Sequence, residues 1–393
     1  MVFAIAFFCE NVFSQSSNFI KGKVVNSADG SAIGNCSVFI NSTSRGTVTN
    51  ASGEFELPGI PAGKLELVIS SIGYETYVYP FSSDQLPLNL KIILKQKSSQ
   101  LAAVTVEPSI KHGWQLWGKT FLENFIGKTT NADACTIKNT KALHFFFSKK
   151  RNRLSVRSDE PLIIQNKALG YIIKYQLEEF YCDFNTNITL YLGYPFFQEM
   201  EASKRKLAGW KQERRKAYYG SVIHFMKSIY DNKLTEQGFQ IIRTEKVINV
   251  EKQRVKDIYK KLIPTADTFS IQNGSLVNMN KRVSLPADSV AYYTSVLNKP
   301  DSYERYVLLN ADSISYVNDN GKKLVFFTGK LHVVYKNTRE QTSGQSEINL
   351  VTPAPIQIEP NGSYYPPQEV LSSGYWAMYE KIANSLPLDY QPD

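Results

Sequence analysis

The stretch from residue 19 to residue 96 constrains this chain most, because short runs of β-branched and apolar residues alternate there with turn residues. Turns such as Asp29-Gly30, Asn50–Gly53 and Pro61–Gly63 separate the runs at the spacing of a small sandwich of short strands. The runs lie at residues 20–25, 37–40, 46–49, 54–57, 64–70, 77–79 and 88–94. We therefore expect a seven-stranded antiparallel β-sandwich at residues 19–96.

Short motifs within this stretch carry a family resemblance. They are Gly22-Lys23-Val24, Asp29-Gly30, Gly46–Thr49, Gly53-Glu54-Phe55, Pro61–Gly63 and Ser70–Tyr74. Together they resemble the carboxypeptidase regulatory-like domain, which has a prealbumin-like, carbohydrate-binding-like fold. The sequence departs from that family at Ala32, where Pro is common, and at Cys36, where a small Ala is usual. Neither departure disturbs the strand pattern.

The resemblance implies little about function. This domain is found in envelope proteins of Gram-negative bacteria, often in front of a TonB-dependent receptor, and it usually serves as a structural appendage without catalytic residues. The rest of the chain resembles an uncharacterised extension found after this domain in similar proteins. That second resemblance implies no activity.

The first residues read as a secretory signal. A short apolar run, Val2–Phe8, is followed by Val12–Gln15, which suits a signal peptide over residues 1–15. No Lys or Arg precedes the run, so we expect that Met1 is a late start and that the signal begins upstream. The alternative is a buried N-terminal strand. No later stretch has the roughly 18 uncharged apolar residues of a spanning helix, so we do not expect the chain to span a membrane.

The remaining length predicts an α+β trunk. With 393 residues, 42% of them hydrophobic and 21% charged, the chain has the composition of a globular protein of two or three domains. We expect a linker at residues 97–110, an α+β domain at residues 111–245 and a mixed-strand region at residues 246–393 packed on it. The fold class is thus a β-sandwich followed by a domain of mixed antiparallel sheet and helix.

Apolar periodicity predicts the helices of this trunk. Tyr218, Val222, Phe225 and Ile229 follow at i, i+4, i+7 and i+11, which predicts one long amphipathic helix over residues 203–231. Further helices are expected at residues 112–126, 255–262 and 374–383, the last of these closing the chain.

A basic cluster lies at the start of the predicted long helix. Its candidate binding residues are Lys204, Arg205, Lys206, Trp210, Lys211, Arg214 and Arg215. One interpretation is a helix face that docks on anionic lipid or glycan, with Trp210 as an aromatic contact; the other is an ordinary solvated helix face. The net charge of +9 favours an anionic neighbour, which for an exported protein would be a lipid headgroup, lipopolysaccharide or acidic glycan, with no nucleic acid.

Residues that could carry chemistry are scattered. The four histidines, His112, His144, His224 and His332, are never within four residues of one another, so no metal-binding helix face is expected. We expect His144 and His224 to be packed core residues. After signal removal Cys36, Cys135 and Cys182 remain, and a Cys135–Cys182 disulfide and three buried thiols both fit the pattern.

The sequence has no Gly-x-Ser-x-Gly motif of the kind that carries a catalytic serine. We therefore expect no cofactor, no metal and no enzymatic activity. The leading hypothesis is a secreted or outer-membrane-associated protein of the periplasm, outer-membrane surface or extracellular space. It would act by binding or assembly with an outer-membrane protein, anionic lipid or glycan. The alternative is a hydrolase of glycan or peptide with an unrecognised site.

Overall fold

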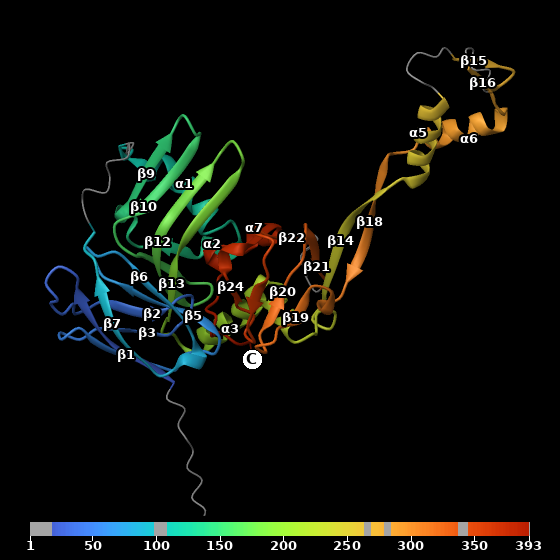
Figure 1. The fold of residues 1–393 in the computed structure, drawn as a ribbon. Coiled ribbons are helices and arrows are strands. Elements are labelled where there is room, and N and C mark those ends of the chain that lie inside the picture. The colour runs from blue at the N-terminus through green and yellow to red at the C-terminus, as the bar shows by residue number, and fades with distance from the viewer. Residues whose placement is uncertain (1–17, 98–107, 263–268, 279–283, 337–344, 393) are drawn as a thin grey trace, which may run out of the picture.

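The structure is a computed structural model, and it describes residues 18–97, 108–262, 269–278, 284–336 and 345–392. The predicted signal peptide at residues 1–15 lies outside the described residues, as does most of the predicted linker. The fold is mixed α+β, with two small N-terminal sheets followed by further, mostly antiparallel sheets of three to six strands and by helices (Figure 1).

Residues 19–96 form the expected seven strands, here called the sandwich. The strands are β1 (Phe19–Asn26), β2 (Ser37–Ile40), β3 (Gly46–Val48), β4 (Glu54–Pro58), β5 (Lys64–Ser70), β6 (Tyr77–Ser82) and β7 (Leu88–Leu94). They make two sheets, β4-β1-β7 and β3-β2-β5-β6, around one core that includes Val24, Val38 and Leu67. The sandwich is not wholly antiparallel, because β7 runs parallel to β1. A parallel partner requires a long crossover, and the chain makes it by passing through the second sheet before it returns.

The residues from 108 onward form the trunk, whose first sheet has the order β8-β11-β12-β10-β9, with β13 paired to β12. Its strands are β8 (Cys135–Ile137), β9 (Leu143–Ser148), β10 (Arg153–Ser158), β11 (Leu162–Asn166), β12 (Tyr171–Asp183) and β13 (Ile188–Glu199). The predicted helix at 112–126 is confirmed as α1 (Gly113–Phe125), and α2 (Thr130–Asp133) follows it. Phe121 and Phe125 of α1 are fully buried against this sheet, with the rings of Phe121 and Phe180 4.8 Å apart.

The single helix predicted over residues 203–231 is wrong, because the structure has two helices, α3 (Lys204–Tyr218) and α4 (Val222–Tyr230). Gly220 between them has a φ of +88°, a left-handed conformation that ends a helix. Ser221 then begins α4, since its side chain accepts the His224 N–H at 3.1 Å. The break lets α3 pack on the first sheet while α4 packs in a second core.

The second core lies between α4 and two further sheets. These have the orders β18-β14-β21-β22-β25 and β19-β20-β23-β24. Their strands are β14 (Phe239–Ile248), β18 (Ser302–Leu309), β19 (Ser315–Val317), β20 (Lys323–Val325), β21 (Leu331–Tyr335), β22 (Gln345–Leu350), β23 (Ile356–Ile358), β24 (Tyr364–Tyr365) and β25 (Val370–Gly374). Phe225 of α4 packs on Trp376 with ring centroids 5.2 Å apart.

The predicted closing helix at 374–383 is shorter than expected. Only α7 (Tyr375–Tyr379) is helical, and a 3-10 turn at Ile382–Asn384 follows. The helix ends because the chain turns back to the first sheet. Ile382 and Ala383 are buried in the first core, which lies between α1 and that sheet, and the Ala383 N–H donates to Ile126 O at 3.1 Å. The C-terminal segment thus ties the two cores together.

An arm leaves the body between the paired strands β14 and β18 (Figure 1). It carries α5 (Val250–Leu262), α6 (Ala287–Leu297) and the small strands β15 (Phe269–Gln272), β16 (Ser275–Asn278) and β17 (Ser284–Leu285). Helix α5 begins earlier than the predicted 255–262. The domain boundary predicted after residue 245 falls within β14.

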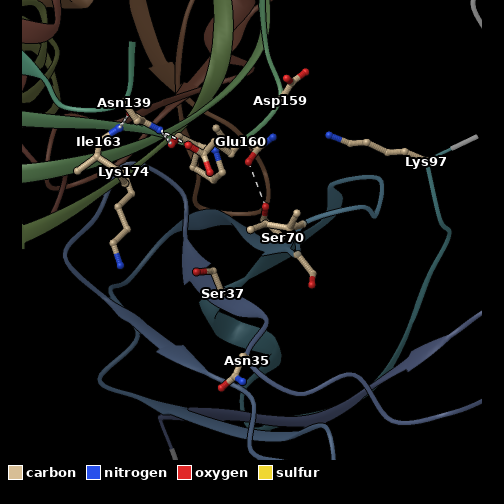
Figure 2. Close-up of a pocket in the computed structure, with 13 residues that line it drawn as sticks. Asn35, Ser37, Ser70, Lys97, Asn139, Asp159, Glu160, Ile163 and Lys174 are labelled. Atoms are coloured by element: carbon tan, nitrogen blue, oxygen red, sulfur yellow. Dashed lines mark hydrogen bonds between the residues drawn. The ribbon is translucent and has the colours of Figure 1, made fainter. Parts of the chain in front are cut away.

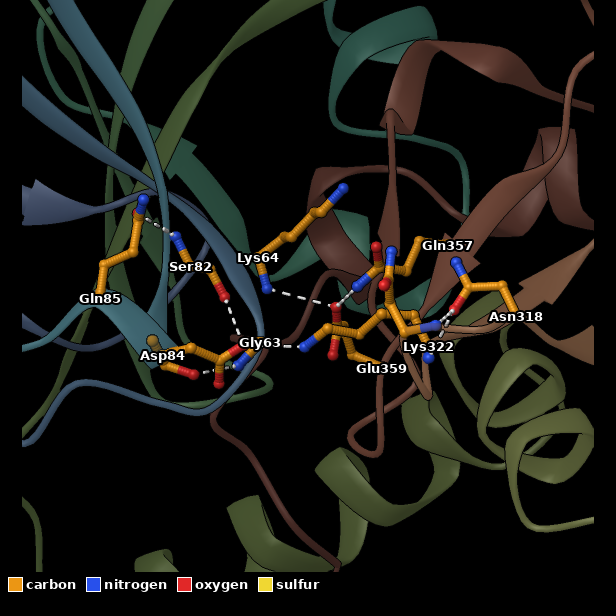
Figure 3. Close-up of polar contacts among 11 residues, drawn as sticks. Gly63, Lys64, Ser82, Asp84, Gln85, Asn318, Lys322, Gln357 and Glu359 are labelled. Atoms are coloured by element: carbon orange, nitrogen blue, oxygen red, sulfur yellow. Dashed lines mark hydrogen bonds and ion pairs between the residues drawn. The ribbon is translucent and has the colours of Figure 1, made fainter.

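The sandwich is fastened to the trunk at several places. At one, the Lys64 N–H donates to Glu359 Oε1 at 3.3 Å, and Lys322 forms an ion pair with Asp84 at 2.9 Å (Figure 3). Glu359 is only 7% exposed and also accepts the side-chain amide of Gln357 at 2.6 Å. A buried carboxylate therefore joins the two parts through hydrogen bonds that offset its loss of hydration.

A second fastening uses the last residues of the chain. Asp389 accepts the Ser44 N–H at 2.9 Å, and the Leu388 N–H donates to Ser42 O at 2.7 Å. Beside them the Phe197 N–H of β13 donates to Thr43 O at 3.0 Å. These backbone contacts fix the loop after β2 between the first sheet and the C-terminal tail.

Candidate binding surface on helix α3

Helix α3 is anchored to the first sheet by Trp210. Its indole is only 3% exposed, and the indole N–H donates to Lys167 O at 2.8 Å. Gly170, with a φ of +74°, lets the ring approach, because a Cβ at that position would lie 2.1 Å from the ring. The predicted role of Trp210 as an exposed aromatic contact therefore has to be corrected: Trp210 holds the helix in place.

Arg214, one helical turn further on, has the same role. It is 7% exposed, its Nε donates to Leu169 O at 2.7 Å, and its Nη1 lies 2.6 Å from Glu199 Oε1. The guanidinium also stacks over the Tyr171 ring at 3.9 Å. Residues four apart share one face of a helix, which is why Trp210 and Arg214 point inward together. Arg214 therefore does not belong to the exposed cluster predicted for it.

The remaining cations lie on the outer side of the helix, and we call them the basic face. The basic face consists of Lys204, Arg205, Lys211, Arg215 and Lys216, all of them exposed. Among the described residues Lys204, Arg205 and Arg215 have no ion-pair partner, whereas Lys216 pairs with Glu213 at 2.6 Å. Lys206 lies instead at the edge, with its ammonium 5.3 Å from the centre of the Trp210 ring.

The charge on this helix is one-sided. Glu213 is the only acidic residue in the 15 residues of α3, and the first turn holds cations where the helix dipole favours anions. Lys204 and Arg205 therefore do not stabilise the helix that carries them. The sequence prediction identified the cluster, but it included the two inward residues and left Lys216 out of the candidate set. Trp210 and Arg214 are four residues apart and so lie on one face of a helix. This spacing was the signal in the sequence that could have separated these two residues from the rest of the cluster.

Comparison with known proteins identifies the N-terminal part of the chain. The family model described as CarboxypepD_reg-like domain matches residues 20–106. Residues 20–106 are a CarboxypepD_reg-like domain. The family resemblance read from the sequence is thus confirmed, and the sandwich is the folded form of this domain. A search of curated protein sequences found no match to the chain.

Solved structures align with the chain at low similarity. A cohesin–X-dockerin complex from Acetivibrio cellulolyticus aligns at 17% identity over 20% of this chain and 56% of that chain, with a TM-score of 0.16. A protein of unknown function from Bacteroides fragilis NCTC 9343 aligns at 10% identity over 88% and 91% of the two chains, with a TM-score of 0.17. BcpA, the major pilin subunit of Bacillus cereus, aligns at 9% identity over 88% and 96%, with a TM-score of 0.16.

The cysteines are free thiols in the structure, Cys36 in the CarboxypepD_reg-like domain and Cys135 and Cys182 in the trunk. Burial raises the pKa of all three, to about 12 for Cys135, so the reactive thiolate is disfavoured. Of the two interpretations of the cysteine pattern, the structure has the unpaired one.

The histidines differ in environment. His224 is 3% exposed, accepts the Gly220 N–H at Nδ1, and burial lowers its pKa, as expected for a packed core histidine. His144 is 38% exposed and its Nε2 lies 2.6 Å from Asp159 Oδ2, so the core position predicted for it is wrong. It lies on β9, where alternate residues face outward, and His144 takes an outward position.

In the part of the chain that the structure describes, no three His, Cys, Asp or Glu side chains lie close enough together to hold a metal ion. None of the helices described combines the length and the apolar composition of a membrane span.

Proposed function

We propose that this protein is an exported, non-catalytic component of the cell envelope that docks on anionic lipid headgroups through the basic face of α3. The observation that carries the proposal is the division of the helix into two sides. Trp210 and Arg214 fix the inner side to the sheet, and the five cations of the basic face are held together on the outer side.

The expected strength of binding to an anionic membrane comes from electrostatic attraction. Each Lys or Arg held near an anionic membrane surface contributes roughly 1 kcal/mol. Because the basic face is fixed by a buried anchor, its cations meet such a surface together, at little cost in ordering the helix. The outer side of α3 has no large apolar side chain for insertion apart from Leu207, which is 37% exposed, so salt should screen the attraction strongly.

The N-terminal domain supports a location in the cell envelope. The CarboxypepD_reg-like domain resembles modules of envelope proteins, and the apolar run Val2–Phe8 suits export. In the periplasm and at the outer-membrane surface, the basic face would have anionic headgroups within reach. The sandwich is attached to the trunk by fixed contacts, and this agrees with a role in binding and assembly in place of catalysis.

Fractionation of native cells tests this function. We expect the protein in the envelope fraction, with release as the salt concentration of the wash rises. A Lys204→Gln/Arg205→Gln/Arg215→Gln variant should be released at lower salt than the natural chain. Recovery in the cytosol with Met1 retained, or envelope association that ignores both salt and the three substitutions, would refute the proposal.

A further inference from the structure

A cleft of about 320 Å³, lined mainly by polar and charged residues, lies between the CarboxypepD_reg-like domain and the first sheet of the trunk (Figure 2). One wall comes from β2 and β5, where Ser37 and Ser70 are cross-strand partners. The other comes from β11 and β12, where Ile163 and Lys174 are partners. Because paired residues of neighbouring strands point to the same side, these side chains all face the cleft.

The two walls are held at a fixed distance. The Ser70 hydroxyl donates to Gln176 Oε1 at 3.0 Å, and the Thr76 hydroxyl donates to Glu178 Oε1 at 2.8 Å. Further along the same two sheets, the rings of Phe39 and Phe196 pack with centroids 5.3 Å apart. The cleft is therefore a formed feature that requires no closure before a ligand binds.

The polar side chains that line the cleft are of two kinds: some already have a hydrogen-bond or ion-pair partner in the protein, and others are available to a ligand. Glu160 accepts the Asn139 side-chain amide at 2.9 Å, and Asp159 is paired with His144. In contrast, within the described ranges the side chains of Asn35, Ser37 and Lys174 have no hydrogen-bond or ion-pair partner. The hydroxyl of Ser37, the amide of Asn35 and the ammonium of Lys174 can therefore form hydrogen bonds with a ligand in the cleft.

The charges of the lining cancel. Lys97 and Lys174 face Asp159 and Glu160, two positive against two negative, so the cleft offers no net attraction to a strongly charged ligand. An apolar ligand would leave the polar walls without water or partners, which costs roughly tenfold or more in affinity for each group. Ile72, which is 77% exposed, Pro161 and Ile163 add apolar contacts at the cleft.

We propose that this cleft binds a neutral, hydroxyl-rich ligand, that is, a short neutral oligosaccharide. Sugar hydroxyls both donate and accept, which matches a wall of amides and hydroxyls, and the C–H face of a sugar ring suits Ile72. The volume lies at the lower end of ordinary small-molecule sites. The site is separate from the basic face and does not depend on the function proposed for it.

Calorimetric titration of the full chain tests this site. The probes are cellotetraose and chitotetraose as neutral ligands, a heparin tetrasaccharide as an acidic one and tetraglycine as a peptide. We expect binding of at least one neutral probe and weaker or no binding of the other two. An Asn35→Ala/Lys174→Ala variant should bind the neutral probe about tenfold or more weakly, since it removes two hydrogen-bonding groups. Ser37→Trp, which fills the cleft, should abolish binding.

The matched control is Asn89→Ala/Lys91→Ala, which removes the same residue types from exposed positions on β7. It should bind as the natural chain does, as should the basic-face variant. Thermal melts show whether each variant is folded. The proposal is overturned if no neutral probe binds, if the acidic or peptide probe binds more tightly, or if folded cleft variants and the control lose affinity equally.

Discussion

The indole of Trp210 packs directly on the α-carbon of Gly170, so closely that an added Cβ would lie 2.1 Å from Cδ2 of the ring. This contact decides how α3 is rotated and therefore which of its residues face outward. Arg214 completes the anchor through its bonds to Leu169 O and Glu199. The orientation of the basic face thus depends on a glycine in the turn between β11 and β12.

Gly170→Ala should therefore destabilise the protein. The new methyl group meets the indole, and the φ of +74° disfavours any residue with a side chain, so we expect a loss of about 2–4 kcal/mol in the free energy of unfolding. Chemical denaturation measures it. Gly209→Ala is the control: Gly209 lies within α3 with open space around it, and alanine there should stabilise by about 0.5–1 kcal/mol. Equal effects at both sites would contradict the packing described.

Asp389→Ala should loosen the sandwich on the trunk. The substitution removes the acceptor for the Ser44 N–H and hydroxyl and the ion-pair partner of Arg45, and we expect a loss of about 1–3 kcal/mol. Hydrogen exchange of residues 42–46 should become faster. Asp319→Ala, in an exposed turn, should leave both quantities unchanged. Unaltered exchange at residues 42–46 in the Asp389 variant would show that the tail does not hold this loop.

Glu380 should make stability depend on pH. Burial raises its pKa from the usual 4.5 to about 7, while the Val222 N–H donates to its carboxylate at 3.2 Å. The folded state thus binds this proton more tightly than the unfolded state. The associated stability is complete below about pH 4.5 and is lost as the pH rises through about 7, by at most about 3 kcal/mol.

Glu380→Gln removes that ionisation and keeps an oxygen to accept the Val222 N–H. The variant should match the natural chain at pH 4.5 and be the more stable protein at pH 8, as measured by urea denaturation at both values. A stability difference that is the same at the two pH values would rule out Glu380 as the titrating group.

Local pattern was enough to predict the strands of the sandwich and helix α1. There, Gly and Asp mark the turns, and β-branched residues or aromatic spacing mark the elements. The parallel pairing of β1 with β7 was missed, since alternation along a strand says nothing about the direction of its neighbour. Asp389 and Ser44 are 345 residues apart, and nothing local in either residue predicts that they meet.

The composition of the sequence was enough to find the basic cluster, but it did not predict which residues of the cluster face outward. The apolar stripe of Tyr218, Val222 and Phe225 keeps helical spacing across the break, so periodicity alone hid it. Gly220-Ser221, a helix stop followed by an N-cap, was the readable signal. Trp210 among cations looked like a surface contact because Gly170, on which its ring packs, lies 40 residues earlier in the turn between β11 and β12.

Binding to lipid vesicles tests the central claim most directly. The natural chain, a Lys204→Gln/Arg205→Gln/Arg215→Gln variant and a Lys23→Gln/Lys91→Gln/Lys95→Gln control are sedimented with phosphatidylcholine vesicles that contain or lack phosphatidylglycerol. Each variant lowers the net charge from +9 by three, to +6, so only the position of the lost charge differs. At low salt we predict that the basic-face variant loses roughly a hundredfold in partition onto the anionic vesicles, while the control changes little. Equal losses in both variants, or no preference of the natural chain for anionic vesicles, would contradict the account.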